Sequence, residues 1–153
     1  MQQVLRKCLF SLFLVIPALL PGCGGGGSSP PTSNVISTVT LNNGGALKVL
    51  SSGNGTYVIQ GDTLSGVSAM DLTLQYDSAT KSSPTVTQGG LVSGALMAAN
   101  TNVPGSIRIA IVSVQQISGS GTVVTVSFAT DSSPNTLTFI ANSLINSQGT
   151  SLL

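Results

Sequence analysis

Apolar and polar residues alternate along much of this chain, and this period of two is the sequence feature that most restricts its fold. The alternation is clearest in three segments, residues 70–77, 107–112 and 123–128. Their alternating apolar residues are Met70, Leu72, Leu74, Tyr76, Ile107, Ile109, Ile111, Val124, Val126 and Phe128. Because successive side chains of a β-strand point to opposite faces of a sheet, each segment is predicted to be a strand with one buried face.

Turn-forming residues separate these segments from further, shorter candidates for strands. Clusters of Gly, Pro, Asn and Ser occur at residues 42–45, 52–55, 88–90, 104–105, 118–121 and 132–135. The shorter candidate strands are residues 38–41, 46–50, 56–60, 91–97, 136–140 and 143–145. No segment beyond the N-terminal apolar run has helical periodicity. Short strands with frequent turn signals are typical of an antiparallel β-sandwich, which we expect over residues 35–153 with about nine strands.

The first 22 residues have the pattern of an export signal. Arg6 and Lys7 precede an apolar run over residues 8–20, which is shorter than the roughly 20 residues of a membrane span. Residues 20–23 read Leu-Pro-Gly-Cys and resemble the lipobox of bacterial lipoproteins, in which the Cys thiol receives a diacylglycerol before cleavage. Cys23 is therefore predicted to be lipidated and to hold the chain on a lipid bilayer.

A stretch rich in Gly, Ser and Pro follows this signal. Residues 24–34 read GGGGSSPPTSN, a composition typical of a flexible tether with a stiffer end, so residues 23–34 are expected to lift the domain off the membrane. In similar lipoproteins a Gly after the lipidated Cys implies the outer membrane. The expected location is the bacterial cell envelope, facing the periplasm or the cell surface. Because Cys8 leaves with the signal and Cys23 carries lipid, the domain is expected to have no disulfide.

Charge and residue types exclude several classes of function. The chain has five Lys and Arg, four Asp and Glu, and no His. Without residues 1–22, three cations and four acids remain, a net charge of −1 that excludes a basic nucleic-acid-binding face. Without His, Glu or a free Cys, the usual bases, nucleophiles and metal ligands are missing. The exported part is thus predicted not to be an enzyme and to need no cofactor or metal.

The four aspartates offer little alternative chemistry. Asp71 and Asp77 lie six positions apart on one predicted strand, about 20 Å at roughly 3.3 Å per residue, which is too far for a glycosidase pair. Asp62 and Asp131 are expected in loops, where they could meet a Ca²⁺ ion together with backbone carbonyls. This calcium site remains an alternative without an Asp-x-Asp motif to support it.

Three segments resemble a cohesin domain: SGVSAMDLTLQYD at residues 65–77, GGLVSG at residues 89–94, and PGSIRIAIVSVQQISGSGTVVTVSF at residues 104–128. Cohesins are nine-stranded jelly-roll sandwiches that bind dockerin modules, and they share a superfamily with certain carbohydrate-binding modules. The resemblance therefore implies a jelly-roll topology and a protein partner. In dockerin-binding relatives, a strand with an Asp five residues before its Tyr faces the partner, and this position is Asp71. Alternation places Thr73 and Gln75 on the same face, opposite Met70.

The resulting prediction is a membrane-anchored, extracytoplasmic protein-binding module of cohesin type with a dockerin-like partner and an expected link to polysaccharide degradation. One alternative is a carbohydrate-binding module of the same superfamily. Such modules usually stack sugars on exposed Trp or Tyr, whereas this chain has no Trp and two Tyr, Tyr57 and Tyr76. The other alternative is a structural subunit of a surface assembly.

Overall fold

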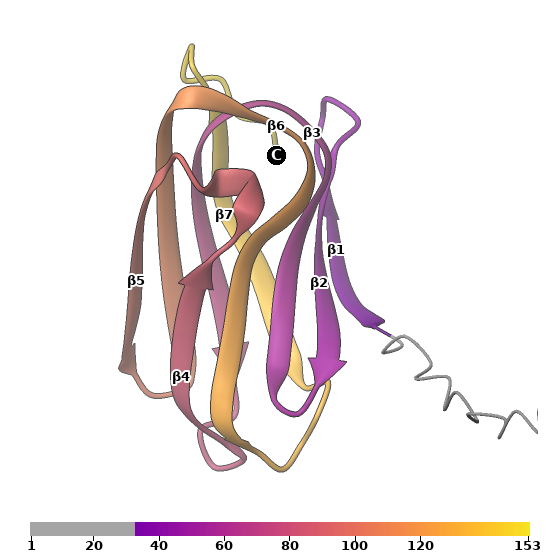
Figure 1. The fold of residues 1–153 in the computed structure, drawn as a ribbon, viewed down its shortest axis with the longest axis vertical. Helices are drawn as coiled ribbons and strands as arrows, with labels where there is room; N and C mark the ends of the chain where they lie inside the picture. The colour runs from indigo at the N-terminus through magenta and orange to yellow at the C-terminus, as the bar shows by residue number, and fades with distance from the viewer. Residues whose placement is uncertain (1–32) are drawn as a thin grey trace, which may run out of the picture.

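The computed structural model describes residues 33–153, which form an antiparallel β-sandwich (Figure 1). The predicted signal peptide, Cys23 and most of the tether lie outside the described residues. The strands are β1 (Asn34–Thr40), β2 (Ala46–Gly53), β3 (Thr56–Tyr76), β4 (Lys81–Gln88), β5 (Leu96–Val103), β6 (Ser106–Asp131) and β7 (Leu137–Asn146). A single 3₁₀ turn, η1 (Gly90–Val92), joins β4 to β5. None of the described residues belongs to a helix long and apolar enough to cross a membrane.

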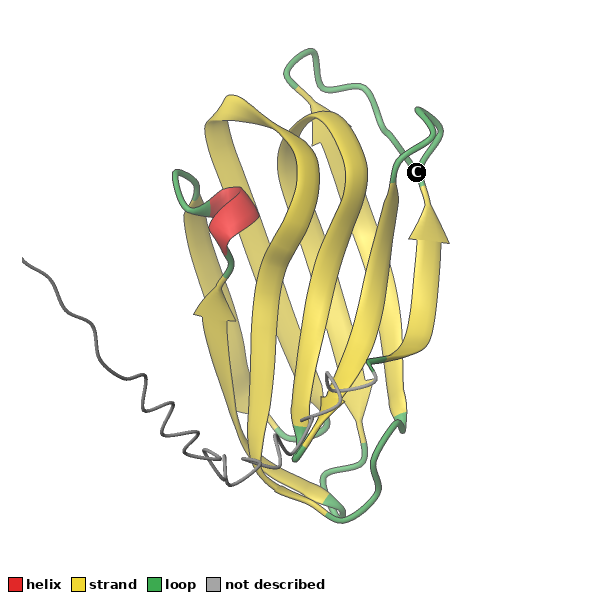
Figure 2. Ribbon diagram, turned by 45° about the vertical axis from the view of Figure 1, so that its right-hand side comes forward, coloured by secondary structure: helices red, strands yellow, loops and turns green. Residues whose placement is uncertain are grey.

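Two long strands, β3 and β6, bend so that each belongs to both layers of the sandwich (Figure 2). Layer one has the order β1, β2, first half of β3, second half of β6, β4. Layer two has the order β7, second half of β3, first half of β6, β5. Seven continuous strands thus supply nine strand segments, which confirms the predicted all-β sandwich and explains its expected strand number.

Glycine conformation makes this bend possible. Register shifts between β3 and β6 lie between Gly61 and Leu64 and between Leu64 and Val67. Opposite them, Gly119 pairs with Leu64 at a φ of 104°, a value that favours Gly because it has no Cβ to clash. The prediction that a turn at residues 118–121 separates two strands is therefore wrong, because β6 continues through these residues. This segment is instead a bend inside β6, because the facing strand bends at the same level and keeps the ladder paired.

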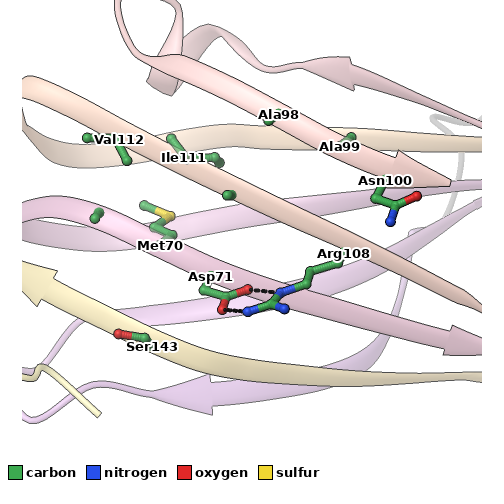
Figure 3. Close-up of a pocket in the computed structure, with 11 residues that line it drawn as sticks. Met70, Asp71, Ala98, Ala99, Asn100, Arg108, Ile111, Val112 and Ser143 are labelled. Carbon is green, nitrogen blue, oxygen red and sulfur yellow. Dashed lines mark hydrogen bonds and ion pairs between the residues drawn. The ribbon is translucent and has the colours of Figure 1, made fainter.

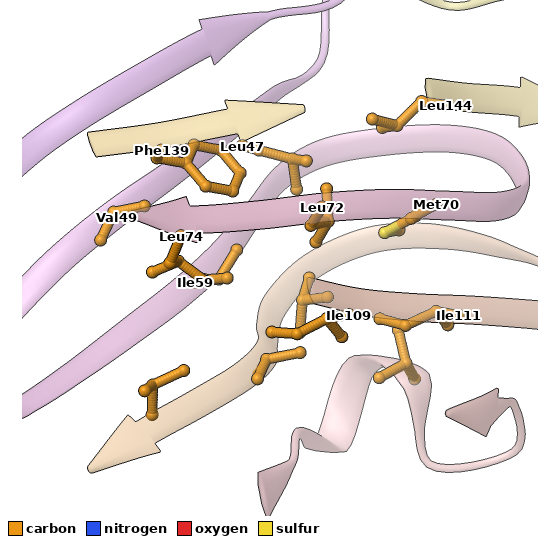
Figure 4. Close-up of a cluster of buried hydrophobic side chains, with 14 of the residues drawn as sticks. Leu47, Val49, Ile59, Met70, Leu72, Leu74, Ile109, Ile111, Phe139 and Leu144 are labelled. Atoms are coloured by element: carbon orange, nitrogen blue, oxygen red, sulfur yellow. The ribbon is translucent and has the colours of Figure 1, made fainter. Parts of the chain in front are cut away.

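The core fills the space between the layers (Figure 4). The three alternating segments point their apolar side chains inward as predicted, and Leu72, Leu74, Ile107, Ile109, Ile111, Val124 and Val126 are fully buried. The exception is Tyr76, which is only partly buried at the end of β3 and lies against the Phe128 ring at a centroid distance of 4.9 Å. The alternation therefore gave the correct register for both long strands, since a slip of one residue would have exchanged their faces.

Other local predictions also differ from the structure. The expected strand at residues 91–97 is mostly η1 and its following turn, and β5 begins only at Leu96. The segment KSSPTVTQ was not expected to be a strand but forms β4. Its apolar content is low because β4 pairs only with β6, and an edge strand tolerates Pro84 and the positive φ of Ser83.

A buried ion pair lies where β4 begins and β6 ends. The Lys81 and Asp131 side chains are 0% and 3% exposed, with Nζ 2.8 Å from Oδ1. Lys81 also donates to the Ser133 carbonyl and to Thr136 Oγ1, and the Tyr57 hydroxyl donates to Asp131 Oδ2. Burial, together with the hydrogen bond to Asp131, raises the pKa of Tyr57 to about 12. Burial alone would raise the pKa of Asp131, but hydrogen bonds from Lys81 and Tyr57 bring it below its ordinary value.

Candidate functional site

The outer face of layer two carries the three residues predicted to bind a partner. Asp71, Thr73 and Gln75 follow one another on the outward side of β3, opposite the buried Leu72 and Leu74. In the register of the sheet, Asp71 lies between Ala110 of β6 and Ser143 of β7. All three predicted residues therefore lie on one surface, in the middle of a four-stranded layer.

Asp71 and Arg108 form a bidentate ion pair across β3 and β6 (Figure 3). Arg108 Nε lies 3.1 Å from Asp71 Oδ1, and Nη2 lies 2.6 Å from Oδ2. Asn142 Nδ2 approaches Asp71 Oδ1 at 3.3 Å and donates to Thr73 Oγ1 at 2.8 Å. The hydrogen bond from Arg108 holds the pKa of Asp71 below its ordinary value, so the carboxylate is ionised at neutral pH.

A shallow hollow of about 450 Å³ opens beside this ion pair. Its residues come from β3, β5, β6 and β7. Four alanines from three neighbouring strands, Ala69, Ala98, Ala99 and Ala110, line it together with Arg108. Small side chains leave a depression because the longer side chains around them stand higher above the sheet. The hollow thus combines an apolar lining with a charged rim.

Exposed aliphatic side chains gather around the same face. Leu96, which pairs with Val112, is 81% exposed, Val112 is 55% exposed, and Val114 is completely exposed. Ile140, opposite Thr73, is 38% exposed. By contrast, the outward face of β4 in layer one carries polar residues, including Thr85 and Thr87. An exposed apolar cluster rimmed by polar groups is typical of a binding surface.

The sequence did not predict Arg108, Asn142 or the alanine hollow. Arg108 was counted only as a cation and as the polar partner of two isoleucines. A usable signal was present, because Ala98 and Ala110 stand at exposed positions of strands where a larger polar side chain is usual. That alanines from three strands meet in one hollow, however, depends on the register between these strands.

The alternative calcium site assumed that Asp62 and Asp131 lie in loops, and this assumption is wrong. Asp62 lies within β3 and pairs with Lys48 at 2.5 Å, whereas Asp131 ends β6 in the buried pair with Lys81. Gly121 pairs with Gly61, the residue before Asp62, and it precedes Asp131 by ten residues, about 33 Å along the strand. Asp62 and Asp131 are therefore too far apart to bind one ion. Within residues 33–153, no three His, Cys, Asp or Glu side chains gather in a way that could hold a metal ion.

The two tyrosines are not placed for sugar stacking on this face. Tyr57 is 1% exposed, and its ring packs edge-on against Phe128 at 5.8 Å. Tyr76 packs against the same Phe128 ring at 4.9 Å. Neither ring lines the alanine hollow, whereas Tyr76 lines a separate hollow beside Gln75. The alanine hollow itself therefore has no aromatic platform of the kind that carbohydrate-binding modules usually use.

Comparison with solved structures defines the class of this fold. No family model matches the sequence, and no curated protein sequence matches it. A non-cellulosomal cohesin from the hyperthermophilic archaeon Archaeoglobus fulgidus is similar, with a TM-score of 0.53, 21% identity, and coverage of 64% of this chain and 71% of the cohesin. The seventh ScaB type I cohesin from Pseudobacteroides cellulosolvens is similar with a TM-score of 0.52 and 17% identity, over 63% of this chain and 72% of the cohesin.

A third similar structure is a chain of the CaDoc0917–CaCohA2 complex, with a TM-score of 0.50, 18% identity, and coverage of 64% of this chain and 80% of its own length. These similarities and the two-layer topology define the chain as a jelly-roll β-sandwich. More particularly, over the 63–64% of the chain that these similarities cover, the fold is that of a cohesin-type domain.

Proposed function

We propose that this protein is a non-enzymatic, protein-binding module of cohesin type, and that its partner docks on the outer face of layer two. The observation that carries the proposal is the position of the alanine hollow. It lies beside Asp71, the residue that the cohesin resemblance selects, on the face that Asp71 shares with Thr73 and Gln75, and exposed Leu96 and Val112 flank it. Protein interfaces commonly combine an apolar centre with a polar rim.

In more detail, we propose that the partner is dockerin-like and that lipidated Cys23 anchors the module in the bacterial cell envelope. The module would then have a role in polysaccharide degradation. The resemblance of residues 65–128 to cohesins supports the partner. The lipobox at residues 20–23 and the Gly-rich tether support the anchor, and Gly24 supports the outer membrane. The lipid proposal is tested by labelling cells with radioactive palmitate. Labelling should be lost in Cys23→Ala, and equal labelling of both chains would refute it.

The docking face is tested by affinity capture from an extract of the source organism on the immobilised chain. Ala110→Arg fills the hollow with a long side chain and should abolish capture of a dockerin-bearing protein identified by mass spectrometry. Thr87→Arg is the matched control, because it places the same side chain on the outward surface of β4 in layer one. Capture that survives Ala110→Arg would place the binding site elsewhere on the domain.

A parallel binding screen on insoluble polysaccharides tests the carbohydrate-binding alternative. We expect no retention, because neither tyrosine ring lines the alanine hollow. Retention on a polysaccharide together with no captured protein would replace the protein-binding proposal with the carbohydrate-binding one.

A further inference from the structure

The carboxylate of Asp71 is already occupied by donors of its own chain. Its Oδ1 lies within reach of Arg108 Nε and Asn142 Nδ2, its Oδ2 accepts from Arg108 Nη2, and the side chain is 26% exposed. A carboxylate oxygen has two lone-pair sites. Asp71 therefore has little remaining capacity to accept hydrogen bonds from a partner, in contrast to the role expected from the sequence.

Arg108, unlike Asp71, keeps hydrogen-bonding capacity for a partner. Its side chain is 68% exposed, and a guanidinium has five N–H donors. Asp71 receives bonds from Nε and Nη2, and within the part of the chain that the structure describes, Nη1 has no hydrogen-bond acceptor. The face therefore offers a partner a positioned cationic donor.

Arg108 is also the only cation of this face among the described residues. Lys48 pairs with Asp62 on layer one, and Lys81 is buried. Elsewhere the described domain has a slight excess of acids. Arg108 is therefore the one cationic donor that this face, within the described residues, offers to an acidic group, and it lies on the rim of the alanine hollow.

The spacing along β6 limits what can use both features at once. Arg108 and Ala110 both point outward and lie two residues apart, about 6.6 Å along the strand. Backbone groups in the middle of a sheet are already paired, so a strand can add to a sheet edge but not to this face. A helix can lie on it, and its residues three or four positions apart have Cβ atoms about 5–6 Å apart.

We propose that Arg108 determines partner choice on this face: the partner presents a helix on which an acidic side chain binds the Arg108 guanidinium and a neighbouring aliphatic side chain enters the alanine hollow. This inference rests on the proposed function of layer two. Asp71 is then a positioning residue that holds the guanidinium beside the hollow. Bidentate carboxylate binding suits Arg because its planar donors match the two oxygens.

The test is a selection of phage-displayed helical peptides, randomised along one face, on the immobilised full chain. Selected peptides should carry Asp or Glu three or four positions from an aliphatic residue. Their affinity should fall about tenfold on Arg108→Gln, which removes the charge and keeps a polar side chain. Affinity should be unchanged on Thr87→Arg. Equal denaturation midpoints for wild type and Arg108→Gln would exclude a folding defect.

The outcomes separate the inference from the function on which it rests. Peptides that are blocked by Ala110→Arg but show no acidic preference and bind Arg108→Gln equally well would overturn the role of Arg108 and leave the docking face intact. Peptides that still bind Ala110→Arg, or a selection that gives no binder, would count against the docking face itself and therefore against both proposals.

Discussion

Replacing Lys81 by Met should strongly destabilise the domain. The substitution keeps the length and the apolar part of the side chain but removes the ammonium that bonds Asp131, Thr136 and the Ser133 carbonyl. Asp131, whose side chain is 3% exposed, would keep only the Tyr57 hydroxyl and the Ser133 amide as donors. Removing one partner of a buried ion pair typically costs about 3–5 kcal/mol, because the other charge remains buried without compensation.

The measurement is equilibrium unfolding in urea, followed by far-UV circular dichroism. With a urea dependence of about 2 kcal/mol per M for a domain of this size, the midpoint of Lys81→Met should fall by about 2 M. The double variant Lys81→Met, Asp131→Leu should lose less stability than the sum of the single variants, since it leaves no buried charge without a partner.

Lys48→Met is the matched control. Lys48 and Asp62 form a pair of similar length, 2.5 Å, but their side chains are 36% and 41% exposed. Water solvates such a pair in either state, so exposed pairs contribute little, and the midpoint should move far less than in Lys81→Met. Equal shifts for the two variants would refute the argument that burial determines the cost.

Two further predictions concern layer one. Gly89→Ala should destabilise the domain severely, because a Cβ there would lie 2.2 Å from the Thr122 carbonyl oxygen, whereas Gly90→Ala meets nothing within 4 Å; similar urea midpoints for the two variants would contradict this. Stability should also fall as pH rises from 10 towards 12, because the pKa of Tyr57 is raised from 10.0 to about 12 and the folded state therefore holds this proton more tightly than the unfolded chain. In Tyr57→Phe this alkaline loss should disappear from the pH dependence of the urea midpoint, and an unchanged profile would assign it to another group.

The candidate face shows where reading the sequence reached its limit. Alternation correctly grouped Asp71, Thr73 and Gln75 on one side of β3, because the side-chain period of a strand is fixed by local geometry. The same reasoning treated Asp71 as a free acceptor. Its pairing with Arg108, 37 residues later in the chain, depends on the register between β3 and β6, which bulges shift at several points.

The sequence by itself determined the class of fold and the inward face of its long strands, because burial of alternating apolar residues depends only on the period of two. Only the tertiary structure decided that residues 118–121 bend a continuous strand, that KSSPTVTQ forms β4, and that Lys81 meets Asp131 in the interior. It also decided that alanines from three strands make one hollow beside Arg108. These features depend on pairing between distant segments, and the energy of such contacts appears only when the layers close and exclude water.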